Sequence, residues 1–466
     1  MRSHLAAAGV AAWLVGGTVR DLLRGSEPGD IDLATAAEPF GPARAFADAI
    51  GGSYFTLSEE FTACRVITRG GEAYDFQQLR GGSIEADLRE RDFTVDAMAL
   101  PLAGGGLIDP LGGEADLSAG RLSPVNDTVF RTDPLRLLRA VRLEKTLSLR
   151  LTGEAGLLVR RDARLAAESA AERQFSELTR IIDAPGTVAA IRRLDEFDLL
   201  EAVLPELAAL KGISQNDFHH LDVFEHTLAA AGAMDDLIMD PAQVFPGTAS
   251  AMKARLETPL AGDASRSQAL ILAALMHDIG KPGCRFTDEV ERVRFFEHDR
   301  LSAELAEQVL GRFHASRTAT GAVVQLVRQH MRLVGLINAG DVSERARVRY
   351  LRATHPYAPE SVLLSVSDRL AVRGPASTGA AIRDHLEFAR EMMARCFAAE
   401  EARPPRLVNG EELMAALGLE PGPLVGRLLE AIEEERALGN VDSREGALEF
   451  ARRLAGGEDG RGTADI

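Results

Sequence analysis

The stretch that most constrains the fold of this chain is "WLVGGTVRDLLRGSEPGDIDLAT", residues 13–35. An apolar run ends at Gly16 and Gly17, a short helical pattern follows, and the chain returns with Asp30 and Asp32 in a second β-like run. Residues i and i+2 of an extended strand point to the same face, so the two aspartates present adjacent carboxylates. The pattern predicts a strand, a short helix and a return strand that carries two negative charges side by side.

Two carboxylates this close are unfavourable unless cations hold them. A pair of Mg²⁺ ions on Asp30 and Asp32 would also clamp a triphosphate and activate an attacking hydroxyl. Gly16 and Gly17 remove side chains where the backbone must approach phosphate, and Arg20 in the following helix can donate two hydrogen bonds to phosphate oxygens. Each motif alone is compatible with a tight turn or a solvated strand end, but together they predict a two-metal site for nucleotidyl transfer.

The rest of the chain divides into a mixed head and a long helical region. Short β-like runs alternate with turns in the head, whereas from about residue 133 the periodicity is helical and almost no strand pattern returns. Residues 240–267 are predicted to be a loop or insertion, and the Pro-rich "EEARPPRL" marks a boundary near residue 400. We therefore predict an α+β protein with a head at 1–130, an all-α neck at 131–205, a helical metal-binding domain at 206–395 and a helical tail at 396–466.

Composition excludes several other classes of protein. At 466 residues, with 46% hydrophobic and 26% charged residues, the chain can form several globular cores. No apolar run is long enough for a transmembrane helix, so no membrane partner is expected. Three widely spaced cysteines indicate neither a disulfide framework nor a thiolate metal site, which fits the cytoplasm. The net charge of −17 argues against non-specific nucleic-acid binding by the whole molecule, but a local basic surface stays compatible with it.

A basic helical pattern runs through "DPLRLLRAVR", residues 133–142. Arg136, Arg139 and Arg142 recur every three residues and share one helical face, and Asp-Pro is a common helix start, so a solvated face and a cap would also explain the pattern. Cytosine and adenine both present an amino donor beside a ring-nitrogen acceptor, whereas uracil and guanine present the opposite polarity. Asp133 and Arg136 could therefore select CTP and ATP, because a mismatched base would leave buried polar groups unpaired.

Five motifs in order resemble class II tRNA nucleotidyltransferases and bacterial poly(A) polymerases of the polymerase β superfamily. The first is "LVGGTVRD…DIDLAT", and "RDFTVDAMA" (91–99) resembles the family motif that contacts the sugar of the incoming nucleotide. "IDPLGGEADL" (108–117) resembles a further family element, "DPLRLLRAVR" the base-reading helix, and "ERQFSEL" (172–178) the helix that braces it. The resemblance implies template-independent addition of C and/or A, from CTP and ATP, to the 3′ end of tRNA.

The resemblance also implies roles for individual residues. Asp30 and Asp32 would hold Mg²⁺, and a third carboxylate is expected on a neighbouring strand, for which Asp75 in "AYDFQQL" is the best candidate. The triphosphate, sugar and base would be held by Gly16, Gly17, Arg20, Arg91, Asp92, Asp133, Arg136, Arg139 and Arg142.

Three features leave nucleotide specificity open. Asp96 stands where the family usually has Asn, which adds negative charge near a triphosphate, and Thr132 stands where the base-reading motif usually has Glu. The segment "GGSIEADLRE" between "DFQQLR" and "RDFT" is short, whereas many CCA-adding members have a long flexible loop there that helps the switch to ATP. CCA addition is the leading hypothesis, and CC-only addition, A-only addition and poly(A) synthesis are the alternatives.

A second set of metal-binding side chains lies in the helical region, in "VFEHTL", "LMHDIGKP", "FFEHDR", "RQHM" and "SVSDRLA". Neutral imidazoles and carboxylates suit Mn²⁺, Ni²⁺, Mg²⁺ or Fe. The set resembles the HD phosphohydrolase superfamily, which implies hydrolysis of a phosphate ester such as a 2′,3′-cyclic phosphate at a damaged RNA end. One metal is expected on His226, His277, Asp278 and Asp368, with His298 and His330 at a second metal or a phosphate; His219, His220, His314, His355 and His385 are expected to be ordinary side chains.

The expected partners are the tRNA 3′ end, CTP and ATP, with no obligate protein partner. The tail resembles that of HD-containing nucleotidyltransferases, in which Gly422 and Pro423 would place a helix start against the tRNA body, although a plain helical bundle gives the same pattern. An alternative hypothesis makes the HD domain the active part and the head an RNA-binding module. The intact Asp30 and Asp32 argue against that alternative.

Overall fold

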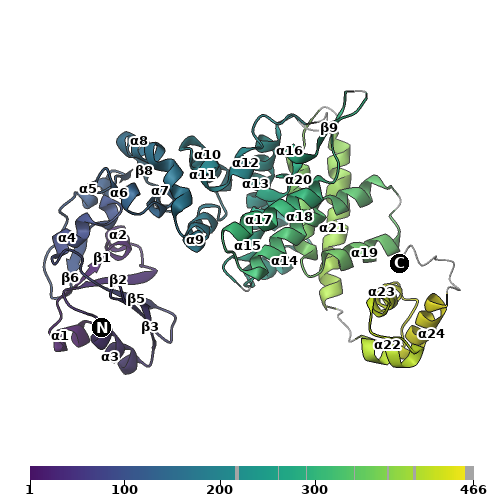
Figure 1. The fold of residues 1–466 in the computed structure, drawn as a ribbon, viewed down its shortest axis with the longest axis horizontal. Helices are drawn as coiled ribbons and strands as arrows, with labels where there is room; N and C mark the ends of the chain where they lie inside the picture. Colours follow the sequence, from purple (N-terminus) through teal and green to yellow (C-terminus); the bar gives the residue numbers. More distant parts are fainter. Residues whose placement is uncertain are drawn as a thin grey trace. The chain divides into compact units, whose positions relative to one another are not determined.

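The computed structural model describes residues 1–215, 220–260, 262–289, 291–340, 342–374, 377–401 and 406–456 (Figure 1). The chain forms two compact units, one of Met1–Ile181 with Ala189–Pro205 and the other of Ile182–Val188 with the chain from Glu206 onward. The first unit combines a sheet with helices, and the described residues of the second are helical apart from one short hairpin. The predicted α+β class is confirmed.

A six-stranded sheet lies at the centre of the first unit, in the order β3-β4-β5-β2-β1-β6. Neighbouring strands are antiparallel except β2 and β5, which run parallel. The apolar run before Gly16 forms β1, the helical pattern after it forms α2 (Gly17–Leu23), and the Asp-x-Asp run forms β2. The strands are β1 (Ala12–Val15), β2 (Asp30–Thr35), β3 (Ser53–Ser58), β4 (Ala63–Ile67), β5 (Ala73–Gln78) and β6 (Ala99–Pro101).

The two faces of this sheet are covered to different extents. One face packs against α1 (Arg2–Ala7) and α3 (Phe40–Ile50) through a cluster that includes Leu33 and Phe76. On the other face, α4 (Ile84–Arg89) packs on side chains of β2, β1 and β6. Because side chains alternate along a strand, Asp32 lies on the face opposite Leu33. The polar side chains of β2, β5 and β4 therefore share the second face.

Helices follow the sheet within the first unit. The prediction that almost no strand follows residue 133 is confirmed for the described residues, where only three very short strands occur. β8 (Arg150–Leu151) pairs with β7 (Arg121–Leu122), and β9 (Arg285–Thr287) and β10 (Val293–Phe295) form a hairpin in the second unit. Strands of two or three residues are too short to show alternation in the sequence. The other elements are η1 (Thr94–Asp96), α5 (Gly113–Ser118), α6 (Val129–Thr132), α7 (Leu135–Leu147), α8 (Gly153–Asp162), η2 (Ala163–Glu168), α9 (Ala171–Ile181), α10 (Thr187–Glu196) and α11 (Leu199–Val203).

The second unit is built around α15 (Arg266–Met276), whose residues from Ala269 to Met276 are all buried. A capping box between Ser265 and Gln268 begins this helix. The elements around it are α12 (Pro205–Ala208), α13 (Val223–Met239), α16 (Lys281–Cys284), β9 (Arg285–Thr287), β10 (Val293–Phe295), α17 (His298–Arg312), α18 (Arg317–Asn338), α19 (Glu344–Thr354), α20 (Ala358–Ala371) and α21 (Gly379–Glu401).

The prediction of a loop or insertion at residues 240–267 is wrong in part. This segment contains η3 (Pro241–Gln243) and α14 (Ala249–Glu257). Only Met252 of α14 is buried, so the helix has no apolar stripe that a periodicity argument could detect.

Three helices at the end of the described chain pack on a core of their own. They are α22 (Gly410–Leu417), α23 (Pro423–Ala437) and α24 (Arg444–Ala455), and α23 begins directly after Gly422. Across the described residues, every helix is too short or too polar to span a bilayer.

Candidate functional site

The three carboxylates that we expected to hold metal lie on two adjacent parallel strands. Asp30 and Asp32 are on β2, Asp75 is on β5, and the register pairs Asp32 with Asp75. Registered partners point to the same face of a sheet, as do residues i and i+2 of one strand. The structure therefore brings the three side chains together on the second face of the sheet.

This carboxylate cluster has an excess of negative charge around Asp32. Burial, together with the charges of Asp75, Asp96 and Asp30, raises the pKa of Asp32 to about 6 despite the nearby Arg91 cation. The raised pKa means that the ionised carboxylate is destabilised where it stands. A divalent cation would remove this destabilisation, and an all-oxygen donor set fits Mg²⁺.

Arg65 of β4 is a site residue that the sequence analysis missed. Its Nε and Nη2 donate to the two carboxylate oxygens of Asp75, each at 2.7 Å, and its Nη2 lies 3.4 Å from Asp30 Oδ2. Arg65 is the only charged residue of the strand "ACRVI", between the buried Cys64 and Val66. That alternation was a usable signal, but the strand register opposite Asp75 could not be read from the sequence.

Gly16 and Gly17 keep the backbone beside Asp32 clear of side chains. A Cβ at Gly16 would lie 2.9 Å from Arg91 Nη1 and 3.4 Å from Asp32 Oδ2, and Gly16 has a φ of +64° that disfavours other residues. A Cβ at Gly17 would lie 3.2 Å from Arg20 Nη2. This is the place where the sequence analysis expects phosphate.

Arg20 and Asp96 form an ion pair that the sequence analysis did not predict. Arg20 Nη1 lies 2.6 Å from Asp96 Oδ1, and its Nε lies 2.8 Å from Asp21 Oδ1. Burial raises the pKa of Asp96, with Arg20 opposing and the charge of Asp92 adding to the rise. The negative charge that Asp96 adds to the site is thus offset by a guanidinium in contact with it.

Asp92 and Arg139, predicted as separate nucleotide-binding residues, form one buried ion pair at 2.9 Å. Burial alone would raise the pKa of Asp92, but Arg139 and Arg136 hold it below its usual range. Arg91 Nη2 similarly donates to Asp87 Oδ2 at 2.9 Å. The Asp92–Arg139 pair connects the sugar motif to α7 of the neck, and the Arg91–Asp87 contact connects it to α4.

Asp133 lies at the junction of α6 and α7 and has both helix-capping and ion-pair contacts. Its Oδ1 accepts from the backbone N–H of Leu135 at 3.2 Å, and its Oδ2 accepts from Arg173 Nη2 at 3.0 Å. The capping role that the Asp-Pro pair indicated is therefore present. Arg173 lies on α9, in the segment predicted to brace the base-reading helix.

The other two neck arginines predicted to bind nucleotide, Arg136 and Arg142, also have protein partners. Arg136 Nη2 donates to the carbonyl oxygen of Glu90 at 2.8 Å, and its Nη1 lies 3.5 Å from Thr132 Oγ1. Arg142 Nε donates to Glu177 of α9 at 2.6 Å, with both side chains largely buried. Arg142 thus ties α7 to α9, the helix expected to brace it, although the sequence analysis assigned Arg142 to nucleotide binding.

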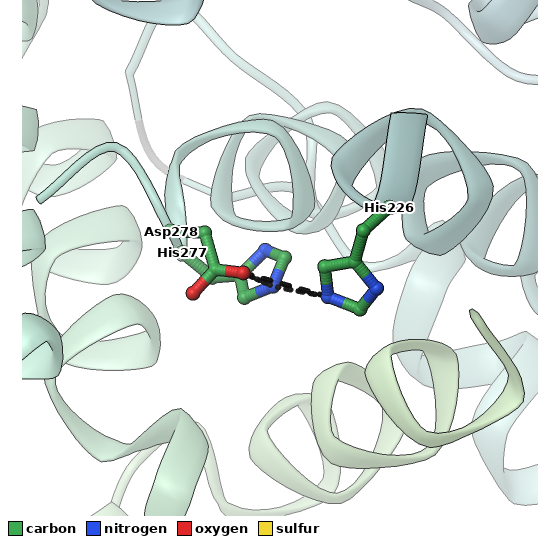
Figure 2. A group of neighbouring side chains, drawn as sticks. All are labelled: His226, His277 and Asp278. Atoms are coloured by element: carbon green, nitrogen blue, oxygen red, sulfur yellow. Dashed lines mark hydrogen bonds and ion pairs between the residues drawn. The ribbon is translucent and has the colours of Figure 1, made fainter. Parts of the chain in front are cut away.

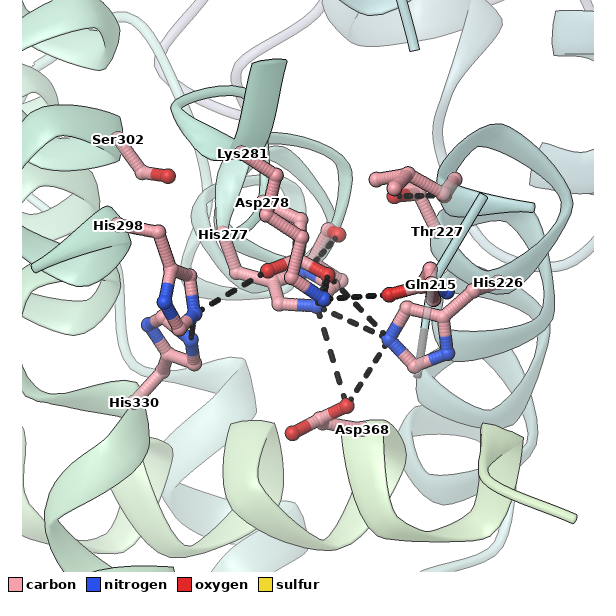
Figure 3. A network of polar contacts seen from close by, with 12 residues as sticks. Gln215, His226, Thr227, His277, Asp278, Lys281, His298, Ser302, His330 and Asp368 are labelled. Atoms are coloured by element: carbon pink, nitrogen blue, oxygen red, sulfur yellow. Dashed lines mark hydrogen bonds and ion pairs between the residues drawn. The ribbon is translucent and has the colours of Figure 1, made fainter. Parts of the chain in front are cut away.

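The six metal-binding residues predicted in the helical region lie in one cluster of the second unit (Figure 3). They come from five elements that lie far apart in the sequence. The contributions are His226 from α13, His277 and Asp278 directly after α15, His298 from α17, His330 from α18 and Asp368 from α20.

Two triads of possible ligands share Asp278, one with His226 and His277, the other with His298 and His330. Asp278 Oδ2 lies 3.1 Å from His277 Nε2 and 3.4 Å from His226 Nε2 (Figure 2). Its Oδ1 lies 3.4 Å from His298 Nε2, which is 3.3 Å from His330 Nε2. One carboxylate therefore faces a histidine pair on each side (Figure 3).

The orientation of the imidazoles indicates cation binding. His277, His298 and His330 each place Nδ1 within hydrogen-bond distance of a backbone carbonyl oxygen, which assigns the proton to Nδ1 and leaves Nε2 as a lone pair directed into the cluster. Burial lowers the pKa of His330 to about 4, so this ring is neutral at neutral pH and keeps its Nε2 lone pair directed into the cluster. A divalent metal ion fits this donor set.

Lys281 and Asp368 complete the surroundings of this metal-binding cluster. Asp368 Oδ1 lies 3.1 Å from His226 Nε2, and Lys281 Nζ lies 2.7 Å from Asp278 Oδ2. Lys281 was not among the predicted site residues, although it belongs to "LMHDIGKP", three residues after Asp278. A cavity of about 480 Å³ opens beside the cluster and is also lined by Arg294.

Two histidines that we expected to be ordinary side chains need comment. His219 lies outside the described residues. His385 is buried, lies 3.2 Å from Ser365 Oγ through its Nε2 and lines the same cavity. Burial lowers the pKa of His385 to about 4.

Comparison with protein-family models matches three segments of the chain. Residues 12–123 match the poly A polymerase head domain, residues 158–211 the "Probable RNA and SrmB- binding site of polymerase A", and residues 223–373 the HD domain. Among solved structures, the Thermotoga maritima CCA-adding enzyme complexed with tRNA has a TM-score of 0.57 at 20% identity, over 97% of this chain and 93% of that one. A CCA-adding enzyme complexed with CTP gives 0.61 at 20% identity, over 97% and 93%. At these identities the likeness shows a shared fold.

Curated relatives extend over nearly the whole chain. The A-adding tRNA nucleotidyltransferase of Deinococcus radiodurans is 37% identical over 453 residues, 95% of both chains. The CC-adding tRNA nucleotidyltransferase of Thermus thermophilus is 35% identical over 463 residues, 97% of this chain and 96% of that one. The chain therefore belongs to the tRNA nucleotidyltransferase and poly(A) polymerase family, and it carries an HD domain after its head.

Proposed function

We propose that this enzyme transfers CMP and/or AMP, from CTP and ATP, to the 3′ end of tRNA without a nucleic-acid template. The observation that carries the proposal is the cluster of Asp30, Asp32 and Asp75 beside the side-chain-free backbone at Gly16. The names of the relatives support it, since both describe tRNA nucleotidyltransferases. In this reaction the RNA 3′ oxygen bonds to the α-phosphorus of the nucleotide, and pyrophosphate leaves.

The three carboxylates would hold Mg²⁺, which when bound neutralises phosphate charge and makes the 3′ hydroxyl a better nucleophile. Gly16 and Gly17 leave space for the triphosphate, and Arg91 and Arg20 place positive charge beside it. Arg65 fixes the orientation of the Asp75 carboxylate through two hydrogen bonds. The ribose would lie near Asp92 and Asp96, with Arg139 and Arg142 connecting that region to the neck.

Base selection is assigned to Asp133 and Arg136. An Asp133 oxygen would accept from the amino group of cytosine or adenine, and Arg136 would donate to the adjacent ring nitrogen. Arg173 contacts the other oxygen of the Asp133 carboxylate at 3.0 Å, which fixes the orientation of that side chain. The contacts of Arg136 to Glu90 and Thr132 are exposed enough to exchange for a base.

Incorporation of labelled CTP and ATP into tRNA that lacks its 3′ end tests this proposal. The wild type is expected to incorporate label, and Asp30→Ala combined with Asp32→Ala is expected to abolish it. Failure of the wild type, or full activity of the double variant, would overturn the proposal. The two relatives with partial specificity favour CC-only or A-only addition as the alternative, and a long adenylate product would indicate a poly(A) polymerase.

We also propose a phosphohydrolase activity in the HD domain, with a divalent metal ion held by His226, His277, Asp278 and Asp368. His298 and His330 would hold a second ion or the phosphate. The convergence of Nε2 atoms on one carboxylate supports this assignment. Ring opening of a 2′,3′-cyclic nucleotide, in which water adds across one P–O bond to give the 2′- or 3′-monophosphate, tests this activity together with the metal content of the purified protein. A protein that stays metal-free after reconstitution with Mn²⁺, Ni²⁺, Mg²⁺ and Fe²⁺ would overturn the proposal.

The proposed division of labour follows the sequence ranges. The head (1–130) performs the transfer, the neck (131–205) reads the base and binds RNA, the HD domain (206–395) hydrolyses phosphate esters, and the tail (396–466) contacts the tRNA body. The compact units group the head with most of the neck and the HD domain with the tail.

A further inference from the structure

The hydrophobic cluster on the second face of the sheet covers only one half of that face. The cluster under α4 involves β2, β1 and β6, and it includes no side chain of β5, β4 or β3. On this half the side chains of Arg65 and Asp75 have exposed fractions of 34% and 25%, and Asp30, on the adjacent strand β2, is 51% exposed. The open half lies directly beside the metal-binding carboxylates.

A single row of side chains crosses this open half. The strand registers pair Asp32 with Asp75, Asp75 with Arg65, and Arg65 with Phe55. Registered partners point to the same face, so Phe55 stands on the carboxylate face while its neighbour Tyr54 packs into the core of the other face. Adjacent strands lie about 4.8 Å apart, which puts Phe55 about 14 Å from Asp32 along the row.

Phe55 is 48% exposed, and two more apolar side chains of the same β3–β4 hairpin, Leu57 and Phe61, are 53% and 59% exposed. Three large exposed apolar side chains on one hairpin are unusual in a surface that is not used for binding. Arg65, on β4 of the same hairpin, lies between Phe55 and the carboxylates, so the row places a cation next to an aromatic ring. Aromatic rings beside arginine are typical of surfaces that stack unpaired bases.

We infer that Phe55 is a stacking platform for an unpaired base of the RNA that the enzyme extends, upstream of its reacting 3′ end. This inference rests on the proposed transfer of nucleotides to RNA. An unstacked strand covers more than the ~3.4 Å per nucleotide of a stacked one, so three unpaired nucleotides can span the roughly 14 Å from Asp32 to Phe55. Arg65 supplies positive charge to the backbone phosphates between the platform and the carboxylates.

The occupant is a nucleic acid strand rather than a second protein chain because the row is continuous with the carboxylate site. A protein partner on the edge strand β3 would need no alignment with Asp75 and Asp32, and it would gain little from Arg65. The sequence-tolerant character of stacking also suits a surface that must accept the 3′ ends of different tRNAs.

Binding of hairpin RNAs that end in one or in three unpaired 3′ nucleotides tests the inference, with the Kd measured by fluorescence anisotropy. Phe55→Ala is expected to weaken binding of the three-nucleotide end by about fivefold or more, the loss of one stacked base, and to leave the one-nucleotide end unchanged. Phe55→Tyr keeps an aromatic ring and is expected to bind like the wild type. Phe286→Ala, at a phenylalanine that is 55% exposed in the second unit, is the matched control.

The inference would be overturned if Phe55→Ala and the wild type bound the longer RNA end with equal affinity. It would also be overturned if the substitution weakened binding of both RNA ends equally. A change in oligomeric mass without a change in RNA affinity would assign the hairpin to a protein contact instead. The wild type must also extend an RNA in the same preparation. If it extends none, the proposed transfer itself fails, whereas an active wild type with an unaffected Phe55→Ala variant removes only the platform.

Discussion

The charged side chains of the head site hold one another in position through ion pairs. Asp32 is surrounded by carboxylates and opposed by Arg91, Asp96 is paired with Arg20, and Asp75 is held by Arg65. The substitution of Asp for the usual Asn at position 96 is understandable here, because Arg20 lies 2.6 Å away and offsets its charge. The site therefore needs added positive charge chiefly at Asp32.

Asp32→Asn is expected to lower nucleotide incorporation by more than about 100-fold, since losing even an outer partner of a metal ligand costs about 10- to 100-fold. The amide keeps the shape of the side chain and removes the negative charge. Asp48→Asn on α3, the same chemical change at an exposed carboxylate, is the control and should retain activity. Incorporation within tenfold of wild type in Asp32→Asn would contradict the metal-binding role.

The magnesium requirement is expected to depend on pH through Asp32. Below about pH 6 this carboxyl holds a proton in the metal-free protein, and Mg²⁺ must displace it. The half-saturating Mg²⁺ concentration should therefore rise about tenfold per pH unit below that value and level off above it. Asp96→Asn removes a charge that raises the pKa of Asp32, so its curve should shift to lower pH.

Both proteins are titrated with the same nucleotide, so that protonation of the nucleotide cancels in the comparison. Superimposable curves for the wild type and Asp96→Asn would show that Asp32 does not govern the pH dependence.

Asp133→Ala is expected to weaken discrimination for C or A against U and G by about 1–3 kcal/mol, the cost of one unmatched buried polar contact. Competition between CTP and UTP, or ATP and GTP, in one reaction measures it. Arg173→Ala removes the partner of Asp133 without removing the acceptor, so it should lower kcat/KM while largely preserving the preference. Unchanged preference in Asp133→Ala would leave this residue with its helix-capping role alone.

At the scale of elements, periodicity and motif order were informative where a helix or strand was long and had one buried face. The β1–α2–β2 unit and the histidine-bearing helices were predictable for that reason. Contacts that depend on strand register could not be predicted, as the pairing of Arg65 with Asp75 shows. The helix α14 and the strands of two or three residues could not be predicted either. Candidate metal ligands could be named from residue type and spacing, whereas the ion pair of Arg20 with Asp96 required the positions of two elements 76 residues apart.

A buried ion-pair network joins three helices of the second unit. Glu360 of α20 is 2% exposed, and its Oε1 lies 2.8 Å from both Arg255 Nε of α14 and Arg266 Nη1 of α15. Glu360→Ala is expected to lower the free energy of unfolding by about 3–5 kcal/mol, because it leaves two guanidinium groups without their shared partner. Urea unfolding followed by far-UV circular dichroism measures the change.

Glu400→Ala is the matched control for this network, since Glu400 also pairs with Arg255 but is 38% exposed. An exposed pair contributes at most about 1 kcal/mol. Equal effects of the two substitutions would show that burial does not set the strength of these ion pairs.

At the scale of the whole molecule, the two clusters proposed to bind metal, Asp30, Asp32 and Asp75 in the head and the histidine cluster of the HD domain, lie in different compact units and share no residue. Their activities are therefore expected to be separable. Asp30→Ala combined with Asp32→Ala should lose nucleotide incorporation and keep hydrolysis of a cyclic nucleotide, and His226→Ala combined with Asp278→Ala should do the reverse. Parallel loss of both activities in either variant, with its circular dichroism spectrum unchanged, would contradict the assignment of one reaction to each cluster.

Sequencing of the RNA product tests the central claim most directly. The wild type is incubated with three tRNAs, lacking the whole CCA end, the final CA or only the final A, and with each nucleoside triphosphate alone and all together. The account predicts that at least one of these tRNAs gains C and/or A up to a defined length that never passes CCA, and gains neither U nor G. Absence of extension on all three, incorporation of U or G at a comparable rate, or an adenylate tail of undefined length would contradict it.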